Sequence, residues 1–146
     1  MLSKLKQMLP NIGLSLLFIF IAFGILDAFW LGYLAEPWYK TEMKGMLREQ
    51  FITWPWLVFY LTYGFVTFVL AVIPNRSKPW YYALIDGALL GLASYGAYNL
   101  TAYSILEGFT LKILFIDWVW GICLTSASAG AGWLGFQCLS TTQGRT

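Results

Sequence analysis

Two aspartates lie inside segments of the chain that are otherwise apolar. Asp27 belongs to the stretch GILDAFW and Asp117 to the stretch ILFIDWVWG. Each is followed three residues later by a tryptophan, Trp30 or Trp120, so acid and indole are predicted to share a helix face. An aspartate at the centre of a spanning helix costs roughly 2.5–3.5 kcal/mol, and such residues commonly mark a relay, pathway or ligand site. We therefore expect both carboxylates to turn inward.

Further polar residues fall at the depth of the two aspartates. At about 1.5 Å per residue, Asp27, Tyr60, Asn99 and Asp117 lie about 8–12 Å below the predicted extracytoplasmic ends of their helices. Tyr95 precedes Asn99 by four residues and shares its face. This layer predicts a polar, aromatic-lined cavity within the membrane. Its candidate ligand-binding or polar-core residues are Asp27, Trp30, Tyr60, Tyr95, Asn99, Asp117 and Trp120.

A second interpretation of the same layer is structural. Buried polar side chains fix the register of neighbouring helices through hydrogen bonds, each worth about 0.6 kcal/mol on average in membrane bundles. The residue types are compatible with both interpretations. The sequence also leaves open whether the carboxyl groups of Asp27 and Asp117 touch.

The chain contains no histidine. This excludes histidine-ligated haem, histidine-rich metal sites and a Ser-His-Asp triad. A phosphate-binding glycine loop is absent as well, and no side chain stands out as a nucleophile. We therefore predict no catalytic residue, no metal site and no cofactor, and a membrane enzyme acting on lipid is the least favoured class.

The composition predicts an integral membrane protein. The 146 residues are 59% hydrophobic and 11% charged, and the mean hydropathy is +0.65. Soluble domains are about 45–50% apolar and about 25% charged. Runs of about 20 apolar residues, enough to cross a bilayer, occupy 11–34, 54–73, 80–106 and 111–136. We predict an all-α polytopic protein, an antiparallel bundle of four transmembrane helices forming a single membrane domain over residues 1–146, with the first run as an uncleaved anchor.

The connections between the runs differ in length. Residues 37–51 are predicted to form a short interfacial helix between spans one and two, with its apolar face in the headgroup boundary. A lid packed on the end of the bundle, or a gate over a site, are the alternatives. The segment PNRSK, residues 74–78, predicts a tight turn. Asp86 lies near this turn and is expected to pair with Arg76 or Lys78.

Basic residues near the spans predict the orientation. One side of the membrane receives the basic residues Lys4, Lys6, Arg76, Lys78 and Arg145. The other side receives Lys40, Lys44, Arg48 and Lys112, offset by Glu36, Glu42, Glu49 and Glu107. Since basic loops stay in the cytoplasm, both termini are predicted to be cytoplasmic.

Small residues are concentrated in the third and fourth runs. Gly87-x-x-x-Gly91 lies in one, and SASAGAG occupies residues 126–132 of the other. Such residues let helix backbones approach closely in lipid. They predict close packing either inside the bundle or between copies in a homo-oligomer.

Five motifs together resemble a known family. They are Asp27-x-x-Trp30, then Pro55 with Phe59-Tyr60-x-x-Tyr63, Gly87-x-x-x-Gly91, Tyr98-Asn99-Leu100-Thr101 and Asp117-x-x-Trp120-Gly121. This pattern is similar to that of small bacterial predicted membrane proteins, the domain of unknown function 2177. The resemblance implies four spans and an inner-membrane location, but no activity. The family's third block usually reads Tyr-Asp-Leu-Thr-Asn, whereas this chain has Asn99 at the acid position and Ala102 at the final amide position.

Two functional hypotheses follow. In the first, a non-enzymatic membrane protein uses an extracytoplasmically open cavity to bind or help move a small amphiphile, a lipid or a proton-coupled solute, with Asp27 and Asp117 as polar anchors. In the second, the chain is an accessory or assembly subunit of a larger membrane complex. The expected partners are membrane lipids and a possible membrane protein or second copy. No basic patch of the nucleic-acid-binding type is present.

Overall fold

The computed structural model describes the backbone of residues 2–45 and 47–143 and the side chains of residues 8–45 and 47–139. Within these ranges the chain is all-helical, as predicted. Its helices are α1 (Leu2–Phe29), α2 (Glu36–Glu42), α3 (Trp54–Thr67), α4 (Trp80–Ile105) and α5 (Leu111–Gln143). A π-helical turn, Trp30–Leu34, extends α1, and a second, Phe68–Val72, extends α3 into a 3-10 turn at Ile73–Asn75.

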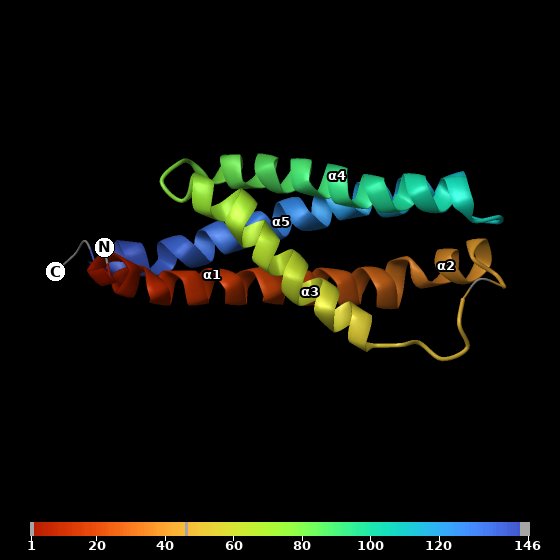
Figure 1. The fold of residues 1–146 in the computed structure, drawn as a ribbon, viewed down its shortest axis with the longest axis horizontal. Coiled ribbons are helices and arrows are strands. Elements are labelled where there is room, and N and C mark those ends of the chain that lie inside the picture. The colour runs from red at the N-terminus through yellow and green to blue at the C-terminus, as the bar shows by residue number, and fades with distance from the viewer. Residues whose placement is uncertain (1, 46, 144–146) are drawn as a thin grey trace.

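Helix α5 is the central element of the fold. It packs against α1 on one side and against α4 on the other, while α3 crosses the molecule obliquely (Figure 1). The first turn of α1 and the last turn of α5 lie at the same end of the molecule, together with the turn that joins α3 to α4 (Figure 1). The short helix α2 lies at the opposite end.

Three helical segments are long and apolar enough to cross a membrane: Met8–Leu34, Trp54–Asn75 and Leu111–Leu139. Helix α4 matches the predicted run 80–106 closely and has 26 residues, yet it is not among them. Asp86, Asn99 and several tyrosines lower its mean hydropathy. The described residues therefore contain three candidate spans and one long, less apolar helix.

The contact between α4 and α5 is made by glycines. A Cβ atom added to Gly87 would lie 2.7 Å from the Cβ of Ala129, and one added to Gly91 would lie 2.6 Å from the carbonyl oxygen of Gly121. Neither distance is compatible with a side chain in this backbone. The small residues at these positions therefore serve packing inside the molecule.

Polar side chains join the helices along their length. Ser15 Oγ on α1 donates to the carbonyl oxygen of Gly132 on α5 at 2.7 Å. The Tyr63 hydroxyl on α3 lies 2.6 Å from Ser94 Oγ on α4 and 3.0 Å from Thr125 Oγ1 on α5. These bonds fix the rotation of each helix about its axis, because each partner sits at one position on the helix surface.

The predicted interfacial helix, 37–51, is too long. Helix α2 ends at Glu42, and residues 47–53 are not helical. Gly45 has a φ of +84°, a left-handed conformation that favours glycine and that ends a regular helix. Met46, which belongs to this predicted helix, lies outside the described residues.

The predicted ion pair of Asp86 is also wrong. Its carboxylate accepts a hydrogen bond of 2.5 Å from Asn75 Nδ2, and Lys78 Nζ donates to Asn75 Oδ1 at 3.1 Å. Among the residues that the structure describes, no ion pair joins Asp86 to Arg76 or Lys78. The 3-10 turn buries Asn75 completely and places its amide between the acid and the base.

Of the residues that predict the orientation, the side chains of Lys4 and Lys6 and the whole of Arg145 lie outside the described part of the chain. Arg76 and Lys78 lie in the turn between α3 and α4 and are exposed.

Candidate functional site

Asp27 is almost completely buried, with 8% of its surface exposed. Its Oδ2 accepts a hydrogen bond of 2.6 Å from the Tyr60 hydroxyl, and its Oδ1 accepts one of 2.9 Å from Trp120 Nε1. The carboxylate on α1 therefore binds one donor from α3 and one from α5. A buried carboxylate with a donor on each oxygen avoids most of the cost of leaving water.

Asp117 has an equivalent arrangement built from other helices. Its Oδ1 accepts a hydrogen bond of 2.5 Å from the Tyr39 hydroxyl on α2, and its Oδ2 accepts one of 2.7 Å from Asn99 Nδ2 on α4. The same Asn99 nitrogen donates to the carbonyl oxygen of Tyr95 at 3.0 Å. Each aspartate thus receives one phenol and one N–H group, and the two carboxylates together connect all five helices.

The two aspartate centres are linked by tryptophans and do not bond to each other. The indole rings of Trp30 and Trp120 stack with centroids 4.4 Å apart and an interplanar angle of 5°. Trp38 from α2 meets Trp30 edge-on at 6.0 Å. Since every carboxylate oxygen has its own donor, the carboxyl groups of Asp27 and Asp117 need no shared proton to be satisfied.

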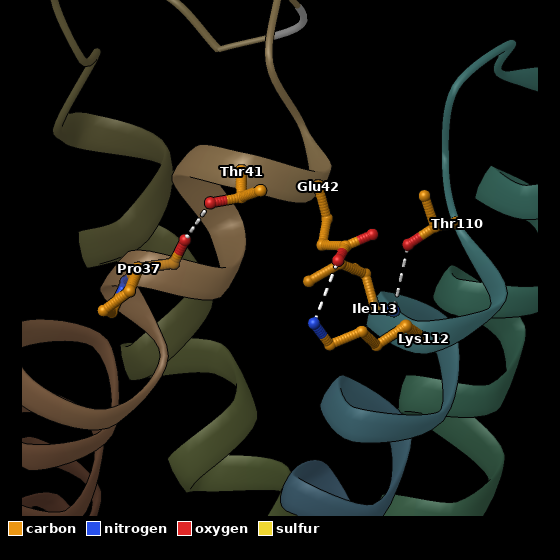
Figure 2. Close-up of polar contacts among 6 residues, drawn as sticks. All are labelled: Pro37, Thr41, Glu42, Thr110, Lys112 and Ile113. Atoms are coloured by element: carbon orange, nitrogen blue, oxygen red, sulfur yellow. Dashed lines mark hydrogen bonds and ion pairs between the residues drawn. The ribbon is translucent and has the colours of Figure 1, made fainter.

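Helix α2 is attached to the first turn of α5. Lys112 Nζ lies 2.9 Å from Glu42 Oε1, and Thr110 Oγ1 accepts a hydrogen bond of 3.3 Å from the backbone N–H of Ile113 at the start of α5 (Figure 2). The Lys112 ammonium group lowers the pKa of the Glu42 carboxyl group below its ordinary value. A further bond, from Thr41 Oγ1 to the carbonyl oxygen of Pro37, lies within α2.

Tyr39 is the residue through which α2 reaches the interior. Burial, followed by the neighbouring Asp117 carboxylate, raises the pKa of the Tyr39 hydroxyl above its ordinary value. The hydroxyl therefore stays protonated and donates to Asp117 at neutral pH. An ion pair and this buried hydrogen bond therefore attach α2 to α5.

A half-open cavity of about 850 Å³ lies between α3 and α4, beneath α2 and the segment that follows it. The apolar residues that line it are Leu31, Met43, Leu47, Phe51, Trp56, Phe59, Phe109 and Ile113. The polar residues that line it are Tyr39, Arg48, Tyr60, Ser94, Tyr95, Tyr98, Asn99 and Asp117. The cavity therefore combines apolar side chains with polar groups that come from α2, the segment after it, α3, α4 and α5.

The seven candidate residues divide into two groups. Tyr60, Tyr95, Asn99 and Asp117 line the cavity. Asp27, Trp30 and Trp120 do not line it; they form the hydrogen-bonded and stacked cluster described above. Tyr60 belongs to both groups, because its ring lines the cavity and its hydroxyl binds Asp27.

Several polar groups beside the cavity lack partners. Asn99 is completely buried, and its Oδ1 has no hydrogen-bond partner. The hydroxyl groups of Tyr95 and Tyr98 have no hydrogen-bond partner among the described residues. Buried polar groups in native proteins are nearly always satisfied, so the unsatisfied Asn99 Oδ1 indicates a position where a ligand or water binds.

Sequence reasoning missed the contributions of α2 and its following segment. Tyr39 binds Asp117, and Arg48 lines the cavity, but both lie in a stretch expected to rest on the membrane surface. Tyr98 was quoted as part of a motif without a role, and it also lines the cavity. No metal-binding group of three His, Cys, Asp or Glu side chains occurs among the described residues.

Comparison with known proteins identifies the family. No curated protein and no solved structure matches the chain. The model of one family, described as predicted membrane protein, DUF2177, matches residues 12–134. This range contains both aspartate centres and the helices that line the cavity. The chain therefore belongs to the DUF2177 family of predicted membrane proteins.

Proposed function

We propose that this protein crosses the bacterial inner membrane four times, as an antiparallel bundle with both termini in the cytoplasm, and binds a small amphiphile or lipid in the cavity between α3 and α4. The cavity carries this proposal, because it combines an apolar wall with unpaired polar groups. A soluble polar substrate would leave the apolar wall unused. An amphiphile matches both surfaces.

The arrangement of α4 supports a fourth span. With 26 residues at about 1.5 Å each, it is about 39 Å long, enough for a hydrocarbon core of about 30 Å. It lies along α5, which is itself a candidate span. Exposed Trp80, Tyr81 and Tyr82 stand at one end and exposed Tyr103 near the other, as in the aromatic belts of spanning helices.

The position of the basic turn supports the orientation. Arg76 and Lys78 lie at the same end of the molecule as the first turn of α1 and the last turn of α5 (Figure 1). The acidic and basic residues of α2 and the segment after it lie at the other end. Basic residues close to spans remain on the cytoplasmic side, so this end faces the cytoplasm and α2 faces outward.

The geometry of α3 supports lateral entry. Tyr63 holds α3 to α4 through Ser94, but toward Trp54 the two helices diverge (Figure 1). The cavity is lined by residues of both helices and is half-open. A volume of about 850 Å³ is within the range of about 300–1,000 Å³ that is usual for ligand sites. It accommodates one small amphiphile, or the head and upper chain of a lipid whose tails stay in the bilayer.

Native mass spectrometry of the mildly solubilised protein tests the proposal. The variant Tyr95→Phe/Tyr98→Phe removes two hydroxyl groups from the cavity without breaking an intramolecular hydrogen bond. The matched control is Tyr33→Phe/Tyr103→Phe, because neither of these tyrosines lines the cavity. We expect the parent and the control to carry a bound amphiphile and the cavity variant to lose most of it. Equal adducts on all three proteins would contradict the proposal.

The accessory-subunit alternative predicts a different result in the same spectra. A stable protein partner would then be carried by parent, cavity variant and control alike, and no small adduct would depend on Tyr95 and Tyr98. The broad apolar exterior, with Trp54, Phe65 and Phe115 more than half exposed, contacts lipid in the first case and a partner in the second.

A further inference from the structure

We infer that the cavity selects amphiphiles whose head group is anionic, and that Arg48 binds this head group at the cavity mouth. The inference rests on the proposed function and specifies the class of ligand. It starts from the charges that face the cavity. Two charged side chains line it, Arg48 and Asp117.

Both carboxylate oxygens of Asp117 already accept hydrogen bonds from the protein. Tyr39 donates to one of its oxygens and Asn99 to the other. Both donors belong to the protein and are fixed by their helices. A cationic head group would therefore meet two carboxylate oxygens that the protein already holds with its own donors.

Arg48 forms no ion pair with the described residues. The other basic residues at this end include Lys40, paired with Glu36 at 2.6 Å, and Lys112, paired with Glu42 at 2.9 Å. Among the described residues no acid pairs with Arg48. Its neighbour Glu49 is exposed and does not line the cavity. Of the two charged groups that face the cavity, Arg48 is therefore the one with no hydrogen-bond or ion-pair partner among the described residues.

The position of Arg48 suits a head group rather than a tail. It lies in the segment between α2 and α3 and lines the cavity together with Leu47 and Phe51. The apolar wall continues from there along α3 through Trp56 and Phe59. The planar guanidinium group binds phosphate or carboxylate oxygens through two parallel hydrogen bonds. A head at Arg48 places an attached chain along this wall.

Lipid titration of the purified, detergent-solubilised protein tests the inference. The probes are phosphatidylglycerol and phosphatidylcholine with identical acyl chains, and bound lipid is counted by native mass spectrometry. We expect the parent to bind the anionic lipid about tenfold more tightly, and Arg48→Gln to remove this preference while leaving phosphatidylcholine binding unchanged. Lys44→Gln is the matched control, because Lys44 lies in the same segment, is exposed and does not line the cavity.

The outcomes separate this inference from the proposed function. Equal binding of both lipids by the parent, with loss of both in Tyr95→Phe/Tyr98→Phe, would overturn the selectivity and keep the lipid site. Retention of neither lipid would overturn both. A preference that Lys44→Gln abolishes as strongly as Arg48→Gln would show general attraction to a basic surface and overturn the role of Arg48. Competition by free glycerol phosphate at the same concentration as lipid would show that the anion alone is the ligand.

Discussion

At the scale of single residues, the main feature is how the protein accommodates two carboxylates among apolar helices. Asp27 and Asp117 each accept one hydrogen bond per oxygen from a neutral donor. The donors come from four different helices, so no local segment satisfies either acid by itself. Each aspartate therefore connects its own helix to two others through hydrogen bonds, and Asp117 also borders the cavity.

The pairing at Asp27 leads to a test of this role. In Asp27→Asn the amide oxygen accepts from Trp120 Nε1, and the amide nitrogen donates to the Tyr60 hydroxyl, which accepts as well as it donates. In Asp27→Ala both donors lose their partner. We expect the amide variant to unfold at a temperature close to that of the parent. We expect the alanine variant to lose about 3 kcal/mol in the free energy of unfolding. Thermal unfolding in detergent measures both, and equal losses would show that the charge itself is required.

At the scale of elements, the arrangement depends on how closely α4 approaches α5 and how far α3 departs from α4. Glycines remove the side chains that would separate α4 from α5. Helix α3 contacts α4 through Tyr63 and Ser94, and its first turns diverge. The short helix α2 and the residues after it cover the space between them. The cavity is thus a consequence of one close and one open helix pair.

The close pair leads to a prediction about Gly91. An alanine there would place its Cβ 2.6 Å from the carbonyl oxygen of Gly121 and 2.9 Å from the Cα of Ile122, both backbone atoms that cannot rotate away. We expect Gly91→Ala to lower the free energy of unfolding by about 1–3 kcal/mol. Gly24→Ala is the control, because nothing lies within 4 Å of its added Cβ, and alanine favours a helix by up to about 1 kcal/mol. An equally stable Gly91→Ala protein would contradict the observed packing.

At the scale of the whole molecule, the function depends on whether α4 crosses the membrane. Four spans with a cytoplasmic N-terminus, as proposed, would place the α3–α4 turn in the cytoplasm and the α4–α5 connection outside. The cavity then opens toward the outer half of the bilayer, with α2 above it. Three spans would place both connections of α4 on one side and would leave its polar residues at the surface.

Cysteine labelling in intact cells distinguishes these arrangements. In a chain carrying Cys123→Ala and Cys138→Ala, Ser77→Cys lies in the α3–α4 turn and Glu107→Cys between α4 and α5, and both positions are exposed. We expect a membrane-impermeant maleimide to label Glu107→Cys in intact cells, and Ser77→Cys to react only after permeabilisation. Lys44→Cys serves as the positive control for the outer side. Equal accessibility of Ser77→Cys and Glu107→Cys would exclude a crossing by α4.

The sequence by itself determined the helical class and the places where α3, α4 and α5 begin. Helices α3, α4 and α5 begin at or next to the first residues of the predicted runs 54–73, 80–106 and 111–136. Apolar length, prolines and turn residues set these helix starts, and each of these features acts over only a few positions of the sequence. It also identified Asp27 and Asp117 as residues that need internal partners, since a charge among apolar residues is costly wherever the chain folds.

Only the tertiary structure decided which partners these are. That Tyr39 turns inward to Asp117, that α2 ends at Glu42 and that Asp27 lies outside the cavity wall follow from the rotation and crossing of whole helices. These are set by contacts such as Gly91 with Gly121, which join residues far apart in the chain. Hydropathy and spacing describe one helix at a time, so the cavity between α3 and α4 had no local signal.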